Sequence, residues 1–252
     1  MKTALLLITH GSPRSEGDDS AVRNRIRLKE ALDMDVYIGY IHLEPSIRDA
    51  ACRMLEDGVE RIIAVPLFVF PGFLTDVTVR KEFGFEPNAS GGVFRNRDRS
   101  AEVVFTGTFG NHPLIKNIFS DICKDNGASP GDTSVMLIFH GSRNNAGTEY
   151  VDRCADYLTD AGFTTEVAYN EFQHPTVEEA TESLVSKGLN VLAIPFFVSP
   201  GVHTTSDIPP KLGLDGSRER DIGNGRTLRY VPEIGMHPGI AEILKARIDE
   251  VL

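Results

Sequence analysis

Residues 135–142 read Val-Met-Leu-Ile-Phe-His-Gly-Ser, an apolar run followed directly by a histidine, a glycine and a serine. Because the run has neither a helical nor an alternating polar break, it predicts a strand buried on both faces, as in a parallel sheet covered by helices. His140 would then lie at the carboxyl end of that strand, the edge at which open α/β sheets bind ligands. The stretch therefore predicts an α/β fold with a ligand site beside His140.

The same pattern occurs once before, at residues 5–12, which read Leu-Leu-Leu-Ile-Thr-His-Gly-Ser, and the two histidines are 140 − 10 = 130 positions apart. Further landmarks repeat at similar offsets, including Pro45 with Pro175 and the late Gly-x-His-Pro segments at 110–113 and 235–238. Repeats of this kind indicate two similar lobes. We expect lobes at residues 1–126 and 134–252, each with a small parallel sheet flanked by helices, facing each other across a cleft.

Within the first lobe, strand-like and helix-like segments alternate. Strands are expected at residues 36–41, 61–68 and 103–105, and helices are expected to begin near Ser20, Pro45 and Asp76 and to cover residues 113–126. Residues 86–100 are polar and contain glycine, which is typical of a loop. The second lobe repeats this order.

The composition is that of a soluble globular protein, with 252 residues of which 41% are hydrophobic and 25% charged. A net charge of −10 argues against a sequence-independent nucleic-acid binder, which needs a basic surface. Three cysteines without a CxxC pair favour a reducing compartment, and no apolar run has the length of a secretory signal or a membrane span. We expect a cytoplasmic protein without nucleic-acid or membrane partners.

The two lobes differ at the chemically important positions. Counted back from the shared prolines, Glu171 matches Ile41, and counted from the Pro-Gly pairs at 71–72 and 200–201, His203 matches Leu74. The first lobe would then keep only His10. His140, Glu171 and His203 follow three successive strands of the second lobe, and parallel strands end at one edge of a sheet. These three side chains are therefore expected to meet in one pocket.

Two imidazoles and a carboxylate suit a borderline divalent metal such as Co²⁺, Fe²⁺, Ni²⁺ or Zn²⁺. The same groups can also transfer protons near neutral pH. The residue types alone leave both roles open for His140, Glu171 and His203.

The chain resembles the class II tetrapyrrole chelatases, most closely the sirohydrochlorin cobaltochelatase and ferrochelatase branch. The resemblance rests on the apolar strand ending in His-Gly-Ser, the glutamate four residues before a Pro-Thr helix start, the segment 200–209 (Pro-Gly-Val-His-Thr-Thr-Ser-Asp-Ile-Pro), and the late Gly-x-His-Pro. It covers essentially the whole chain as two halves. In the first half it is looser, because residues 71–76 lack the family's histidine.

The resemblance implies insertion of a divalent metal, Co²⁺ or else Fe²⁺ or Ni²⁺, into sirohydrochlorin or a closely related tetrapyrrole in cobalamin or sirohaem biosynthesis. His140 and His203 would handle the metal, and Glu171 would act as proton acceptor or third ligand. The metal is then a substrate that needs an open site, and no organic cofactor is implied.

Sirohydrochlorin carries many carboxylates, so basic side chains and helix N-terminal amides near the histidines are candidate substrate contacts. Asp207 is expected either to orient His203 or to cap a helix. The candidate substrate-binding residues are His10, Ser12, Arg14, Ser142 and Arg143.

The other histidines have plainer interpretations. His112, His174 and His237 each precede a proline at an expected helix start, and His42 has no counterpart in the second lobe and is interpreted as incidental. The cysteines are interpreted as small core residues.

Two other functions remain open on the sequence alone. A carrier could bind metal or tetrapyrrole without turnover. Histidine phosphatases also place a histidine-glycine pair after a strand, but with an arginine before the histidine, where this chain has Thr9 and Phe139. Because two fused halves could supply internally what a dimer supplies with two chains, we expect a monomer.

Overall fold

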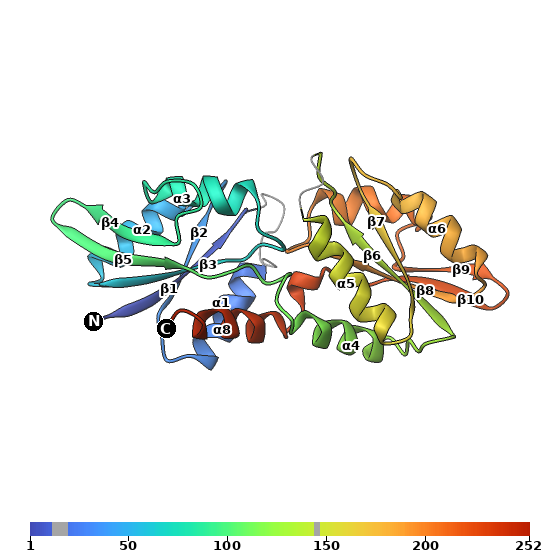
Figure 1. Cartoon of the computed structure of the whole chain (residues 1–252). Coiled ribbons are helices and arrows are strands. Elements are labelled where there is room, and N and C mark those ends of the chain that lie inside the picture. Colours follow the sequence, from blue (N-terminus) through green and yellow to red (C-terminus); the bar gives the residue numbers. More distant parts are fainter. Residues whose placement is uncertain (12–19, 144–146) are drawn as a thin grey trace. The chain divides into compact units, whose positions relative to one another are not determined.

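A computed structural model describes residues 1–11, 20–143 and 147–252. The chain divides into two compact units: unit 1 comprises Met1–His112 and Pro238–Leu252, and unit 2 comprises Pro113–His237. Each unit contains a five-stranded sheet with helices on both faces (Figure 1). The predicted α/β class is confirmed.

The sheet of unit 1 has the strand order β2-β1-β3-β5-β4. Strands β1, β2, β3 and β5 run parallel, whereas β4 pairs antiparallel with β5 at the edge. The strands are β1 (Thr3–Thr9), β2 (Val36–Tyr40), β3 (Arg61–Pro66), β4 (Gly91–Asn96) and β5 (Arg99–Phe105).

The sheet of unit 2 repeats this topology as β7-β6-β8-β10-β9, with β9 antiparallel at the edge. Its central strand β6 carries the opening sequence motif and is buried along its whole length, as predicted. The strands are β6 (Thr133–Phe139), β7 (Thr164–Tyr169), β8 (Asn190–Pro195), β9 (Glu219–Gly223) and β10 (Arg226–Tyr230).

Helices cover both faces of each sheet. A π-helical turn follows β3 at Leu74–Thr78, and another follows β8 at His203–Asp207. The α-helices of unit 1 are α1 (Ser20–Ala31), α2 (Ile47–Glu56), α3 (Val79–Glu82) and α8 (Ile240–Asp249), and those of unit 2 are α4 (Ile115–Asp125), α5 (Thr148–Asp160), α6 (Val177–Ser186) and α7 (Ile208–Lys211).

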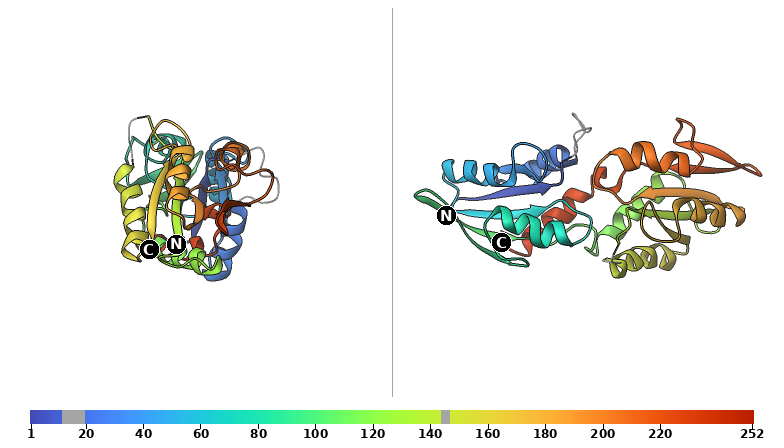
Figure 2. Two further views of the ribbon diagram at one scale, coloured as in Figure 1. Left: turned by 90° about the vertical axis from the view of Figure 1, so that its right-hand side faces the viewer. Right: turned by 90° about the horizontal axis from the view of Figure 1, so that it is seen from above.

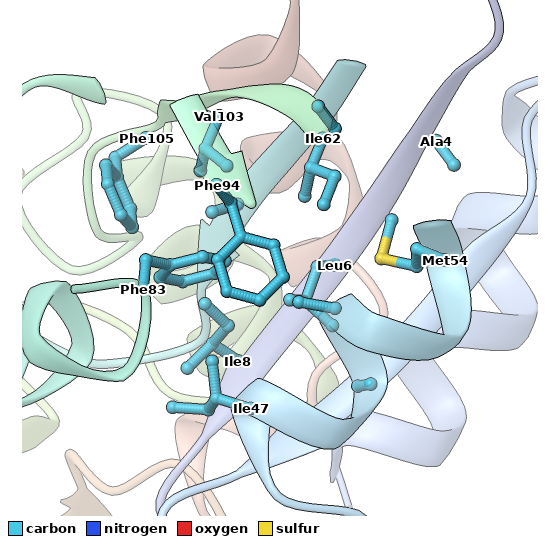
Figure 3. Packing of buried hydrophobic residues seen from close by; sticks show 14 of the residues in the cluster. Ala4, Leu6, Ile8, Ile47, Met54, Ile62, Phe83, Phe94, Val103 and Phe105 are labelled. Atoms are coloured by element: carbon cyan, nitrogen blue, oxygen red, sulfur yellow. The ribbon is translucent and has the colours of Figure 1, made fainter. Parts of the chain in front are cut away.

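The core of unit 1 shows how the alternating faces of β1 are used. Leu6 and Ile8 point to one face, where Ile47 and Met54 of α2 pack on them, and Phe94 of the edge strand completes the layer (Figure 3). Successive strand residues point to opposite faces, so an unbroken apolar run needs helices on both sides. This packing fixes β1, and with it the position of His10.

The closing helices are exchanged between the two halves of the sequence. Helix α4, which follows the first sheet in sequence, packs against α5 in unit 2, and α8 packs against α1 and β3 in unit 1. The right-hand view of Figure 2 shows the red α8 returning to the blue and cyan elements of unit 1. The expected lobes, residues 1–126 and 134–252, therefore differ from the compact units by this exchange.

One expected loop is instead a hairpin. Residues 86–100 were expected to be irregular, but β4 and the start of β5 form an antiparallel edge there, turning at Arg97 with φ +55°. The strand was missed because an edge strand has one solvated side and tolerates polar residues and glycine.

None of the helices in the described ranges has the length and apolar character needed to cross a lipid bilayer.

Candidate metal-binding site

Three predicted side chains converge at the carboxyl edge of the second sheet. His140 directly follows β6, Glu171 lies two residues beyond β7, and His203 opens the π-helical turn after β8. One ligand atom from each can be chosen so that all lie within 4.8 Å of one another. The order of strands in the sequence therefore correctly predicted that these three side chains meet.

His140 is held by its own loop. Its Nδ1 lies 3.0 Å from the carbonyl oxygen of Gly141, so Nδ1–H can donate there and leave the lone pair of Nε2 for a ligand. The amide of Glu171 donates to the carbonyl oxygen of His140 at 2.9 Å. Gly141 has φ +90°, and a Cβ at this position would lie 1.9 Å from the carbonyl oxygen of Glu171. Only glycine allows the two loops to approach so closely.

His203 is oriented through its Nδ1. The carboxylate of Asp207 lies 2.8 Å from this nitrogen, the Asn170 amide nitrogen lies 3.2 Å from it, and the Glu171 carboxylate lies at 3.9 Å. Asp207 makes no side-chain capping bond to α7, so of the two predicted roles the structure supports orientation of His203. An imidazole held by a carboxylate at one nitrogen presents the other to a metal.

Asn170 and Lys211 lie beside His203 and were not found from the sequence. The Lys211 ammonium donates to both the backbone and side-chain oxygens of Asn170, at 2.7 and 2.9 Å. This contact turns the Asn170 amide nitrogen, which can only donate, toward His203, so Asn170 does not bond to an Nδ1–H that is donated to Asp207. Neither residue belongs to a recognisable motif, because they come together only when the loop after β7 meets α7.

The three donors are accessible to solvent. The side chains of Glu171 and His203 are 38% and 37% exposed. Two donors bound to one ion at about 2.1 Å are at most about 4.2 Å apart, so a spread of up to 4.8 Å closes by small side-chain rotations. The arrangement is an open site, in which a metal can be taken up and released.

An aromatic and basic surface borders His140. The ring of Phe172 lies 6.0 Å from the His140 ring, and the Arg143 guanidinium stacks over Phe172 at 4.9 Å. Phe172 is 51% exposed and adopts φ +64°, which is a strained conformation for an aromatic residue. Strained, exposed residues of this kind cluster at functional sites.

The other predicted substrate contacts do not all lie beside His140. The amide of Ser142 donates to the side-chain oxygen of Gln173 at 2.7 Å, which ties the His-Gly-Ser loop to the loop after β7. His10 belongs to unit 1. Ser12 and Arg14 lie outside the described residues.

The predicted match of Glu171 with Ile41 is wrong. Thr9 of β1 pairs with Tyr40 of β2, and Phe139 of β6 pairs with Tyr169 of β7. Equivalent residues of β1 and β6 are therefore 139 − 9 = 130 positions apart, whereas equivalent residues of β2 and β7 are 169 − 40 = 129 positions apart. His42, and not Ile41, therefore occupies the position of Glu171. The count from the prolines was wrong because the loop after β7 is one residue longer than the loop after β2.

The predicted match of His203 with Leu74 is confirmed. Leu74 opens the π-helical turn after β3 just as His203 opens the turn after β8.

Four further titratable groups have structural roles. The His174 imidazole, 2.8 Å from the Glu179 carboxylate, holds the pKa of that carboxyl below its usual range, at a capping box that begins α6. Burial raises the pKa of the Cys123 thiol to about 11 and that of Cys154 to about 12. These thiols are neutral core groups, as predicted.

The comparisons with known proteins agree with this geometry. The family model described as CbiX matches residues 4–126 and 134–251. The sirohydrochlorin cobaltochelatase of Methanopyrus kandleri is 33% identical over 138 residues, which cover 47% of this chain and 96% of that protein.

Two solved structures share the fold across the chain. SirB from Bacillus subtilis with Fe³⁺ has a TM-score of 0.73 at 17% identity, covering 99% of this chain and 95% of that one. CbiX, described as the terminal enzyme for biosynthesis of siroheme in denitrifying bacteria, has a TM-score of 0.70 at 15% identity, covering the full length of both.

Proposed function

This chain belongs to the CbiX family, and from that premise we propose that it inserts a divalent metal ion into sirohydrochlorin or a closely related carboxylate-rich tetrapyrrole. The metal is Co²⁺, or else Fe²⁺ or Ni²⁺, and the product would serve cobalamin or sirohaem biosynthesis. The metal enters as a substrate, and no organic cofactor takes part.

The observation that carries the proposal is the convergence of His140, Glu171 and His203 within 4.8 Å at one accessible edge of the sheet. Two neutral nitrogens and one carboxylate match the preferences of borderline divalent ions. Relatives named for this reaction share about a third of their residues with one half of the chain, which supports the same reaction class here.

The chemistry requires an exchange of one ion for two protons. When M²⁺ enters the macrocycle, both pyrrole N–H bonds break, two protons leave, and four ring nitrogens replace the protein's donors. A site for this reaction must hold the metal weakly and must accept a proton nearby. The solvent-accessible donors described above meet both needs.

His140 and His203 present their Nε2 atoms to the metal, and the Asp207 carboxylate holds the His203 ring in place. The Glu171 carboxylate accepts the first proton, or serves as a third ligand until the macrocycle arrives. An imidazole that has released the metal can accept the second proton.

Arg143 and Phe172 are the proposed contacts to the macrocycle. The guanidinium can pair with a substrate carboxylate, and the exposed ring next to it offers a flat apolar face to the tetrapyrrole. Ser142 shapes this loop through its bond to Gln173, and His10, Ser12 and Arg14 remain proposed contacts from the first half of the chain.

The decisive experiment measures metal insertion by the change in the visible spectrum of sirohydrochlorin, with Co²⁺, Fe²⁺ and Ni²⁺ in turn. We expect His140→Ala and His203→Ala each to lower kcat/KM by about 100-fold or more, because each removes a metal donor, and Glu171→Gln to lower kcat by about 10²-fold to 10⁴-fold. His174→Ala is the matched control, since this exposed imidazole pairs with Glu179 instead.

Two outcomes would contradict the proposal. Stoichiometric binding without repeated turnover would make the protein a carrier. Full activity of His140→Ala and His203→Ala, with loss in His10→Ala, would move the reaction to the first half of the chain.

A further inference from the structure

In unit 1, two histidines, His10 and His42, occupy the positions that His140 and Glu171 occupy in unit 2. Two backbone hydrogen bonds continue the pairing of β1 with β2 beyond the strand ends, and the second joins the His42 amide to the His10 carbonyl oxygen at 3.1 Å. The same bond in unit 2 joins Glu171 to His140 at 2.9 Å. His10 and His42 therefore stand where His140 and Glu171 stand in the candidate site.

The two rings face each other closely. The ring centroids of His10 and His42 are 4.5 Å apart with an interplanar angle of 74°, compared with 4.7 Å and 82° for His140 and His203. The Nδ1 of His10 lies 3.1 Å from the carbonyl oxygen of Gly11, so Nδ1–H can donate there and leave the Nε2 lone pair available. Both histidines are exposed, so an ion can reach them from solvent.

We propose that His10 and His42 form a second, two-histidine binding site for a divalent transition metal ion. The backbone bond between the two loops presets the separation of the rings, which lowers the entropic cost of bringing two donors to one ion. Water fills the remaining coordination positions, because Leu74 stands where His203 supplies a donor in unit 2.

The replacement of glutamate by histidine determines which ions the pair accepts. Two neutral imidazoles carry no negative charge and present no oxygen donor, so hard ions such as Mg²⁺ and Ca²⁺ gain little there. Imidazole favours Cu²⁺, Ni²⁺, Zn²⁺ and Co²⁺, with Cu²⁺ bound most tightly for a given set of nitrogen donors. With two donors instead of three and no charge, the pair binds the same ion more weakly than the cluster in unit 2.

A contact between two rings can exist without any metal, so the test must measure the ion itself. The background is the full chain carrying His140→Ala, Glu171→Gln and His203→Ala, which removes the cluster in unit 2. Cu²⁺ is titrated into this protein and followed by calorimetry and by electron paramagnetic resonance, in which bound imidazole nitrogens split the copper signal. We expect one equivalent of Cu²⁺ to bind with nitrogen splitting.

Variants at position 42 make the test specific. His42→Leu in the same background is expected to weaken Cu²⁺ binding by tenfold or more. His42→Glu recreates the histidine and glutamate pair of unit 2 and is expected to retain the bound equivalent with one fewer nitrogen in the signal. His174→Ala, which removes another exposed imidazole, is expected to leave the equivalent unchanged, and circular dichroism checks the fold of each variant.

The proposal is overturned if the background protein binds no Cu²⁺ with nitrogen splitting, or if His42→Leu binds as well as its parent. It is also overturned if His174→Ala removes the equivalent. Because the measurement is metal binding in a protein without the cluster of unit 2, its outcome does not depend on whether the chain is a chelatase.

Discussion

At the scale of single residues, the donors of the candidate site are held by neighbours that touch neither metal nor substrate. The Asp207 carboxylate lies 2.8 Å from the Nδ1 of His203, and Gly141 lets the loop of His140 approach the loop of Glu171. These neighbours determine which nitrogen each ring presents. Their removal should therefore change metal binding without changing the fold.

Asp207→Asn tests this for His203. Asparagine can face the ring with its amide N–H as well as with its oxygen, so it no longer selects the tautomer with hydrogen on Nδ1, and loss of such a supporting group costs about 10-fold to 100-fold in metal affinity. We expect the KM for the metal to rise by this factor while the KM for the tetrapyrrole stays within about twofold. Asp221→Asn, which removes a carboxylate from edge strand β9, is the control. Equal changes in both variants would mean that only net charge matters.

Phe172→Gly tests whether the strained aromatic residue serves the substrate. Glycine adopts φ +64° without strain, so the free energy of unfolding should rise by about 1 kcal/mol. Loss of the ring should raise the KM for sirohydrochlorin by about threefold to tenfold, the equivalent of one aromatic contact. Urea unfolding and steady-state kinetics measure the two effects. An unchanged KM would remove Phe172 from the substrate surface.

At the scale of elements, the antiparallel edge hairpins are attached to the parallel strands by polar contacts. In unit 2, the Arg226 guanidinium of β10 pairs with the Asp132 carboxylate just before β6, and the Asn190 amide donates to the same carboxylate at 2.8 Å. These bonds hold the pKa of Asp132 below its ordinary value of 3.8. The pair joins the edge hairpin of β9 and β10 to the segment that leads into β6, the strand that His140 follows.

Asp132→Asn should therefore change stability in a pH-dependent way. A carboxyl whose pKa is lower in the folded state stabilises the protein above the ordinary pKa, and this contribution is lost as pH falls through the lower value. We expect the variant to be less stable than the wild type at pH 7, and the difference to shrink as pH falls below 3.8. Urea unfolding at several pH values measures it, with Asp98→Asn as the control. A difference that does not vary with pH would contradict this account.

At the scale of the whole molecule, the exchange of closing helices decides which pieces of the chain can fold. Helix α4 buries Ile115, Ile118, Phe119 and Ile122 in unit 2, although it precedes that unit's sheet in sequence. Burying four large apolar side chains contributes roughly 6–12 kcal/mol, which is comparable to the whole stability of a domain. A unit without its exchanged helix should not be a stable monomer.

Two fragments test this. Residues 113–237 contain the second sheet with α4, whereas residues 127–252 contain the same sheet and site with α8 in place of α4. We expect the first fragment to unfold cooperatively as a monomer, and the second to be unfolded or to associate. Light scattering and near-ultraviolet circular dichroism distinguish these states. A cooperative monomer of 127–252 would show that α8 can replace α4 on the second sheet.

Much of the fold and of the candidate site could be predicted because their signals are local. The unbroken apolar run before His140 predicted a buried central strand, and the order of strands predicted that His140, Glu171 and His203 meet at one sheet edge. The edge hairpin at residues 91–105 was missed, because a strand with one solvated side has a weak pattern. The pair of His10 with His42 was missed because a one-residue difference in loop length hid the register.

The sequence by itself therefore determined the repeated halves, the parallel strands and the residues that end them, since each follows from the hydrophobic period of a short segment. Only the tertiary structure decided three things: which residue stands opposite His10, which neighbours orient His203, and which sheet each closing helix covers. Register, side-chain support and helix exchange depend on packing between segments that are far apart in the chain. No pattern within a single segment records that packing.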